Sequence, residues 1–342
     1  MDAAAVVPYR WEVGKSSGNL SVSSTSAARA VAAERVFKGR GLSPPGSFFR
    51  LLGHAVHERE GVCWVEVGRL SLMAVPATDA IAVPPLLVDS VLRDTGRLAA
   101  TFASAEGLGV PGVAWWVRDR SYGMASVQRQ FRQNLRRSQG VVTVRPLSWG
   151  EFRRHGFAVH REVAAARGGP VPPTTVPDGW SRFCDLLAAD AGFEAFGCLV
   201  AGQLAGYIVA RTTQGLCEGL LAECAPRFAD VRPAHWLYHR FAAEMIRRPG
   251  IRGVTVGRQG IPAIPSLDAF KRHAGYCAEP IRVAAVLHPR WRSGLEAAPV
   301  RGILRWAAGR LGRRAGPLAN VTLLDAAAMT RQSGRARDRG GW

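Results

Sequence analysis

The chain has 342 residues, a formal net charge of +19 and a hydrophobic fraction of 47%. This composition supports packed cores and excludes a disordered or fibrous chain, and the length predicts about two domains. We expect neither a secretory signal nor a membrane-spanning segment, because the sequence has no long run of apolar residues.

The charge and the cysteines narrow the function classes further. Only three of the 45 basic residues are lysines, a bias that GC-rich coding also produces, so part of the charge needs no ligand. The shortage of balancing acids still favours an anionic partner, such as a phosphorylated small molecule, a nucleic acid or a membrane surface. The six cysteines lack metal-ligand spacing, which predicts no metal site and a reducing, cytoplasmic setting.

The N-terminal part of the chain divides into a leader and a globular unit. Residues 1–30 are rich in Ser, Ala and Gly and predict a flexible leader. A globular pattern follows over 31–140, where apolar residues recur at three- and four-residue spacing from Met124 to Leu135. The elements expected here are strands over 62–67, 70–75 and 110–117, and helices over 81–92 and 124–137.

A second unit is expected over 141–290, followed by a basic tail over 291–342. A Gly- and Pro-rich loop at 168–178 has the length of a functional loop or lid. The amphipathic basic helix expected over 300–314 either packs on the second unit or lies on an anionic membrane. The expected elements are strands over 141–144, 193–200, 203–211, 215–224, 254–256 and 281–287, and helices over 149–166, 180–189 and 233–248.

The element order of the second unit, β-α-α-β-β-β-α-β-α-β, is α+β. It places the start of the helix at Pro233 beside the ends of neighbouring strands, where free backbone N–H groups can bind phosphate. The stretch 268–276 holds a second concentration of positive charge. There Lys271 and Arg272 stand between Phe270 and Tyr276, a pattern typical of a site for an anionic, phosphate-bearing substrate.

These motifs resemble those of FemAB-like acyltransferases of the GNAT superfamily, over roughly residues 33–290. The resemblance implies tandem GNAT-like lobes with mixed central sheets flanked by helices. It further implies a degenerate first lobe over 31–140 and an acyl-transfer site in the lobe over 141–290. The stretches that carry it are 117–122, 131–137, 231–237, 254–258 and 270–276.

The acyl donor implied by the resemblance is acyl-CoA or an aminoacyl-tRNA. The loop before the helix at Pro233 lacks the glycines of a standard acetyl-CoA loop, so both donors stay open. The acceptor is an amino group of a small molecule or of a cell-envelope or polysaccharide precursor. The residues expected to bind the donor are Arg227, Arg232, Ala234, His235, Arg258, Lys271 and Arg272.

Four residues are candidates for the chemistry of acyl transfer, which needs a base, a stabilised oxyanion and a proton donor. Glu218 and Glu223, in an apolar strand, are candidates for the general base, although an exposed strand edge is the alternative for either. Lys271 is expected to bind phosphate or polarise the carbonyl, against the alternative of a surface charge. Tyr276 is a candidate proton donor or a packed ring.

The sequence therefore supports two functions. The first is a cytoplasmic N-acyltransferase, with peripheral contact at the inner membrane left open. The second is a non-catalytic protein on the same scaffold that binds a polyanion, either RNA or anionic lipid. His235 and His239 have the i, i+4 spacing of metal ligands, but without a third ligand nearby we expect no metal.

Overall fold

The fold was analysed in a computed structural model that describes residues 44–67, 70–167, 171–260 and 263–295, together with 327, 329 and 330. The predicted leader over 1–30 and the basic helix predicted over 300–314 lie outside these residues. The described helices are α2 (Pro44–Leu51), α3 (Pro85–Thr95), α4 (Arg129–Arg137), α5 (Trp149–Arg167), η1 (Pro173–Thr175), α6 (Pro177–Ala189), η2 (Pro226–Val231), α7 (Pro233–Arg247), α8 (Pro265–His273) and α9 (Pro289–Leu295).

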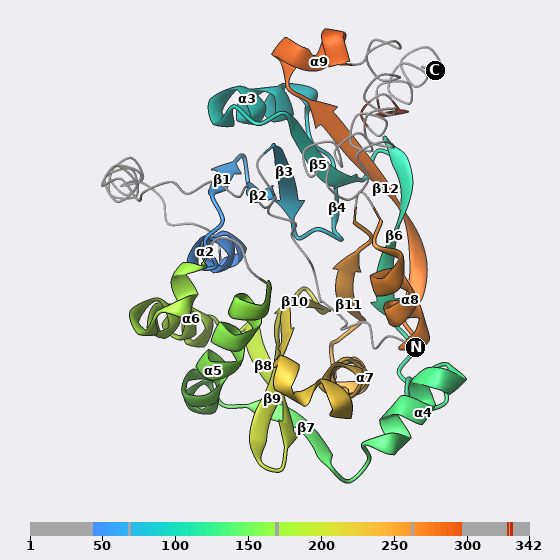
Figure 1. The fold of residues 1–342 in the computed structure, drawn as a ribbon. Coiled ribbons are helices and arrows are strands. Elements are labelled where there is room, and N and C mark those ends of the chain that lie inside the picture. Colours follow the sequence, from blue (N-terminus) through green and yellow to red (C-terminus); the bar gives the residue numbers. More distant parts are fainter. Residues whose placement is uncertain are drawn as a thin grey trace, which may run out of the picture.

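The described strands form one mixed, 12-stranded sheet (Figure 1). They are β1 (Val56–Arg59), β2 (Val62–Val67), β3 (Ser71–Val75), β4 (Ala80–Ile81), β5 (Ala99–Ser104), β6 (Val110–Val117), β7 (Val142–Leu147), β8 (Phe193–Val200), β9 (Gln203–Thr213), β10 (Leu216–Cys224), β11 (Gly253–Arg258) and β12 (Cys277–Leu287). Their order is β1-β2-β3-β5-β12-β6-β11-β10-β9-β8-β7, with β4 beside β5. The predicted α+β class is confirmed, and so is the element order of the second unit.

The two halves of the sheet repeat one pattern. In the N-terminal half, β3 and β5 are parallel and are joined through α3; in the C-terminal half, β10 and β11 are parallel and are joined through α7. Each parallel pair is short: Ser71–Met73 pair with Ala99–Thr101, and Leu216–Glu218 pair with Gly253–Thr255. A parallel pair needs a crossover of this kind because its two strands run in the same direction.

The halves are joined by an exchange of strands. The strand β6, from the N-terminal half, lies between β11 and β12, while β12, from the C-terminal half, lies between β5 and β6. The sheet is therefore continuous, and the boundary predicted between 140 and 141 stays a prediction. Trp115 on β6 packs with side chains of the C-terminal half in one core.

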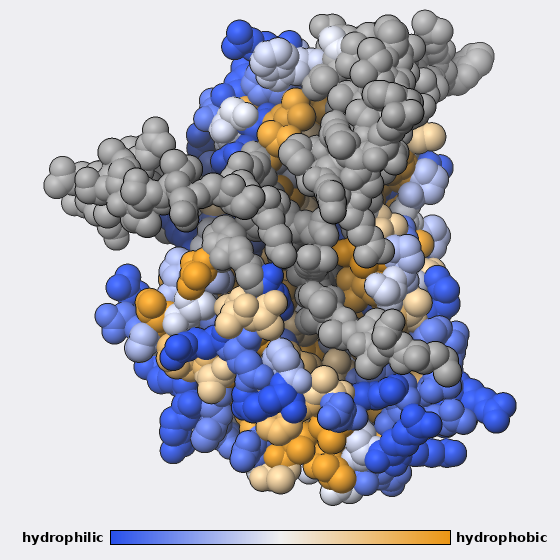
Figure 2. Space-filling model, in the orientation of Figure 1, coloured by the Kyte–Doolittle hydropathy of each residue, from blue (hydrophilic) through white to orange (hydrophobic). Residues whose placement is uncertain are grey.

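The three largest apolar clusters among the described residues cover the faces of the sheet. One lies under α4, α7 and α8, a second joins α2, α5 and α6 to both halves, and a third lies under α3. Hydrophilic side chains occupy most of the described surface in the view of Figure 2. Within the described ranges, each helix is too short or too polar for a bilayer span.

Two local differences from the predicted elements have clear causes. Helix α4 begins at Arg129 rather than at 124, because the preceding segment is held by α8: the Gln128 N–H donates to the His273 carbonyl at 3.0 Å. Strand β5 was not predicted, because its sequence, AATFAS, is rich in small residues, and all six are buried, so no alternation marks it.

Candidate functional site

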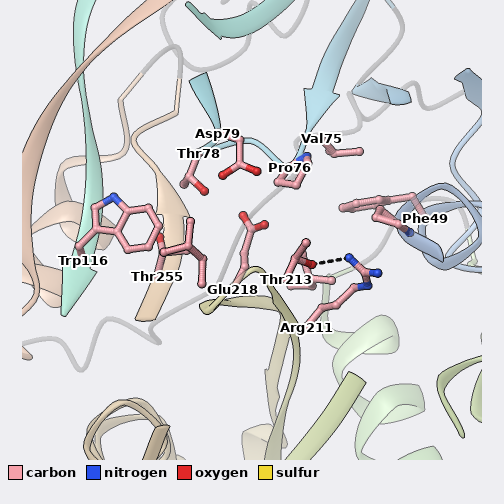
Figure 3. A pocket seen from close by; sticks show the side chains of 13 residues that line it. Phe49, Val75, Pro76, Thr78, Asp79, Trp116, Arg211, Thr213, Glu218 and Thr255 are labelled. Carbon is pink, nitrogen blue, oxygen red and sulfur yellow. Dashed lines mark hydrogen bonds between the residues drawn. The ribbon is translucent and has the colours of Figure 1, made fainter. Parts of the chain in front are cut away.

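A pocket lies at the junction of the two halves (Figure 3). It has a volume of about 30 Å³ and is lined by side chains from α2, the β3–β4 link, β6, β9, β10 and β11. The volume accommodates a group the size of a water molecule or an amine head. Both halves of the chain are needed to form this site.

The pocket lies where two parallel strands part. The ladder between β10 and β11 ends at the pair Glu218 and Thr255, although β10 runs on to Cys224 and β11 to Arg258. A register shift between Gly219 and Leu221 bends β10 at the same point. Beyond Glu218, the described part of β10 is paired with β9 alone, which leaves its other backbone edge facing the space between the strands.

Two carboxylates meet in this pocket. Glu218 projects from β10, and Asp79 projects from the β3–β4 link of the other half, so the two side chains face each other (Figure 3). Burial, with a smaller contribution from the charge of Asp79, raises the pKa of Glu218 to about 8. Burial also raises the pKa of Asp79. A carboxyl with a pKa near neutrality can both take up and release a proton at physiological pH.

Glu223 lies five residues along the same strand, in a buried network. Its side chain is 1% exposed and accepts hydrogen bonds from the Tyr207 hydroxyl at 2.5 Å and from Arg167 Nη1 at 3.1 Å. The His160 ring bridges Glu223 Oε2, 2.8 Å from Nδ1, and the buried Thr174 hydroxyl, 2.7 Å from Nε2. These contacts link β9 and β10 to α5 and to the loop after it.

The register shift decides where the two glutamates point. Glu218 is opposite Arg211 on β9, whereas Glu223 is opposite Tyr207. Arg211 and Tyr207 are four residues apart and share a face of β9, so both glutamates lie on that face, toward α5 and α6. Without the extra residue, an interval of five would place them on opposite faces.

Lys271 lies on the other side of the sheet from the pocket. It is 1% exposed on α8, and burial lowers its pKa to about 8 against the opposing effect of Asp268. Asp268 accepts a hydrogen bond from the Trp115 indole at 3.2 Å, whereas the next residue on β6, Trp116, lines the pocket. Successive residues of a strand point to opposite faces, so Lys271 and Glu218 are separated by the sheet.

Tyr276 packs in the core of the C-terminal half. Its ring is 2% exposed, and its hydroxyl donates to the Tyr238 carbonyl at 3.2 Å. Burial raises the pKa of Tyr276 well above its usual value, which opposes a role as an acid near neutral pH.

A Tyr276→Phe variant tests this placement. We expect it to lower the free energy of unfolding by about 1 kcal/mol, because one buried hydrogen bond is lost, and to leave turnover unchanged. Urea denaturation and steady-state kinetics are the measurements. A loss of turnover at unchanged stability would restore the proton-donor role predicted from the sequence.

The residues predicted to bind the donor form two groups. The first surrounds the start of α7, where Arg232 is the N-terminal cap with a φ of 52° and Arg227 forms an ion pair with Glu162. Ala234 is buried in the first turn. His235 contacts Asn134, with 3.2 Å between Asn134 Nδ2 and His235 Nε2. Burial, and to a smaller extent the charges of Arg232 and His273, lower the pKa of His235 to about 4.

The second group lies along β11 and α8. The Arg258 side chain is buried and donates to the Thr101 hydroxyl of β5 at 3.1 Å. Arg272 is exposed, with its guanidinium 5.9 Å from the centre of the Trp115 ring. The rings of His235 and Phe270, with centres 5.3 Å apart, connect the two groups. The chain thus brings together the helix start and α8, but not Lys271 and Glu218.

Sequence reasoning missed the partners of both glutamates. Asp79 and Thr78 follow a buried strand and a proline, so polar residues at a strand end were the available signal. His160 lies on the apolar face of α5, between Val159 and Val163, where a single polar residue indicates a buried partner. Neither signal names that partner, because it comes from a distant part of the chain.

Comparison with known proteins finds similarity in backbone structure. No protein-family model and no curated protein matches the sequence. The structure is similar to FemX at 10% identity, covering 74% of this chain and 93% of FemX with a TM-score of 0.47. It is similar to L-PGS from Bacillus licheniformis at 14% identity, covering 85% of this chain and 97% of that one with a TM-score of 0.43.

A third similar structure is a tandem GNAT protein from the clavulanic acid biosynthesis pathway. It is 13% identical, and the match covers 75% of this chain and 92% of that one with a TM-score of 0.37. The similar structures thus include Fem-type and GNAT-type proteins, the family that the sequence motifs resemble. Likenesses of this size carry no argument about donor, acceptor or activity.

Proposed function

We propose that this protein is an acyltransferase that moves an acyl or aminoacyl group from a thioester or ester donor to an amino group. The observation that supports it most directly is Glu218, a carboxyl with a pKa of about 8 in a pocket where two parallel strands part. Such a group suits a general base that works near neutral pH.

The residues of the pocket can take part in each step of this reaction. Glu218 removes a proton from the incoming ammonium, and the free amine attacks the carbonyl carbon of the donor. As the new C–N bond forms, the C–S or C–O bond of the donor breaks, and the leaving group takes up a proton. Backbone N–H groups on the free edge of β10 beyond Glu218 are the donors that can stabilise the oxyanion.

The start of α7 is the proposed site for the anionic part of the donor. Its first-turn N–H groups, the positive end of the helix dipole and the Arg232 side chain favour phosphate. Acyl-CoA and an aminoacyl-tRNA both carry phosphates, so the donor is one of these two. The acceptor is an amino group of a small molecule or of an envelope or polysaccharide precursor. The six free cysteines support a reducing, cytoplasmic location, with membrane contact as a further proposal.

A donor panel tests the proposal. Acetyl-CoA, longer acyl-CoAs and aminoacylated tRNA are added to the protein, its melting temperature is measured, and amide formation on primary amines is followed by mass spectrometry. We expect one donor to raise the melting temperature by about 2–4 °C at ten times its Kd, and to be consumed with an amine. The alternative outcome has three parts: every polyanion stabilises the protein equally, moderate salt abolishes the stabilisation, and no donor is consumed. In that case the protein is a polyanion binder and not an acyltransferase.

A further inference from the structure

The pocket contains three oxygen-bearing side chains that converge from two halves of the chain. Asp79 and Thr78 come from the β3–β4 link, and Glu218 comes from β10 (Figure 3). Thr78 is only 7% exposed. Its hydroxyl oxygen is buried and makes no hydrogen bond within the described part of the chain. A buried hydroxyl directed into a pocket without a partner indicates a missing ligand.

The charges of the pocket indicate the kind of ligand. Two facing carboxylates repel each other, and a cation between them relieves both the repulsion and the loss of solvation. Arg211, at the β9 side, is engaged through Nε with Asp190 and through Nη1 with Thr213. The remaining lining side chains are uncharged. The ligand is therefore a small cation that also makes a hydrogen bond with a hydroxyl.

A primary ammonium fits these requirements better than a metal ion. It has three N–H donors, and the pocket offers three acceptors: Asp79, Glu218 and the Thr78 hydroxyl. Within the described residues, no group of three His, Cys, Asp or Glu side chains is placed to hold a metal. A fully methylated nitrogen has no N–H donor to offer these three acceptors.

We infer that Asp79, Thr78 and Glu218 form a subsite for a primary ammonium group, so that the acceptor is a primary amine bound in its protonated form. The inference rests on the proposed function and adds the N-terminal half to the acceptor site. Asp79 and Thr78 hold the nitrogen, and Glu218 removes its proton. Methyl groups on the nitrogen weaken binding, because each one replaces an N–H donor.

The test uses the full chain without any acyl donor. Melting temperature is measured at pH 8.5 and constant ionic strength with n-butylammonium chloride, tetramethylammonium chloride or n-butanol. We expect n-butylammonium alone to raise it, by about 2–4 °C at ten times its Kd. In Asp79→Asn the apparent Kd rises at least about tenfold, and Thr78→Val shows a smaller rise, because each loses one interaction with the ammonium.

Matched controls separate this subsite from a general salt effect. Asp94→Asn removes an exposed carboxylate of the same half, which pairs with Arg59 at 3.4 Å, and keeps the wild-type response. Binding tightens as pH rises from 6 to 8.5, because Glu218 ionises in that range beside Asp79 and Arg211. If tetramethylammonium acts as strongly as n-butylammonium, or Asp79→Asn responds like the wild type, the inference is wrong.

Failure of this inference and failure of the proposed function give different results. If ammonium binding depends on Asp79 but no donor is consumed, the subsite is supported and the proposed acyltransferase function is wrong. If amide forms from the donor and the KM for the amine is unchanged in Asp79→Asn, the proposed function is supported and the inferred subsite is wrong. Because Asp79→Asn can fail to fold, the wild-type comparison of n-butylammonium with tetramethylammonium and the Thr78→Val variant each decide the matter independently.

Discussion

Replacing Glu218 by glutamine is expected to lower turnover by about 10²- to 10⁴-fold, because the amide cannot accept the proton of the attacking ammonium. In the wild type, kcat/KM rises with pH and levels off above about pH 8, where Glu218 is ionised. The variant loses that dependence. Amide formation with the donor identified above, measured from pH 6 to 9, is the test.

The same substitution should stabilise the fold at alkaline pH. The folded state raises the pKa of Glu218 from 4.5 to about 8, so it binds this proton more tightly than the unfolded chain does. Stability is therefore lost as pH rises from 4.5 to 8, and the loss is complete above 8. Glutamine imitates the protonated acid, so Glu218→Gln should gain on the order of 5 kcal/mol at pH 9 and nothing at pH 4.

A matched control distinguishes a base from a charge that merely lies nearby. Glu244→Gln alters a half-exposed glutamate of α7, which pairs with Arg248 four residues on. It should change neither the pH profile nor the alkaline stability by more than a small amount. A Glu218→Gln enzyme with wild-type kcat/KM at pH 8 would contradict the role of Glu218, whatever its stability.

Replacing Glu223 by alanine is expected to lower the free energy of unfolding by about 3–5 kcal/mol. The carboxylate is the shared acceptor of Tyr207, His160 and Arg167, and its loss leaves two of these groups buried without that partner. Urea denaturation at pH 7 measures the loss. Glu223→Gln, which keeps the volume and one acceptor oxygen, should lose less than the alanine variant.

The comparison for this network is an ion pair on the surface. Glu279 binds Arg118 through two hydrogen bonds, at 2.5 and 2.8 Å, and both side chains are exposed to solvent. Because water screens such a pair, Glu279→Ala should cost less than about 1 kcal/mol. Equal losses at Glu223 and Glu279 would show that burial does not set the strength of the Glu223 network.

The two glutamates of β10 show how far sequence reasoning reaches. A carboxyl in an apolar strand is predicted to have a raised pKa, with an exposed strand edge as the alternative, and the pKa of Glu218 is raised. The roles of the two residues were not separable, because a one-residue register shift sets their directions and depends on pairing with β9. The partners Asp79 and His160 are far away in the sequence, so no local pattern indicates them.

The motif around Lys271 shows where prediction from a local sequence motif fails. Its composition of lysine, arginine and aromatic rings predicted a site for an anionic, phosphate-bearing substrate. The structure buries Lys271 beside Asp268 on the face of the sheet opposite to the pocket. A local concentration of charge in the sequence does not indicate on which face of the sheet it lies, because the face depends on how the helix packs.

The sequence by itself determined the α+β class, the element order of the C-terminal half and the helix start at Pro233. Periodicity, turn residues and the conformation of proline are local properties of the chain. Only the tertiary structure decided the exchange of β6 and β12, and with it the meeting of Asp79 and Glu218. These depend on backbone pairing between distant strands, which carries little side-chain signature in the sequence.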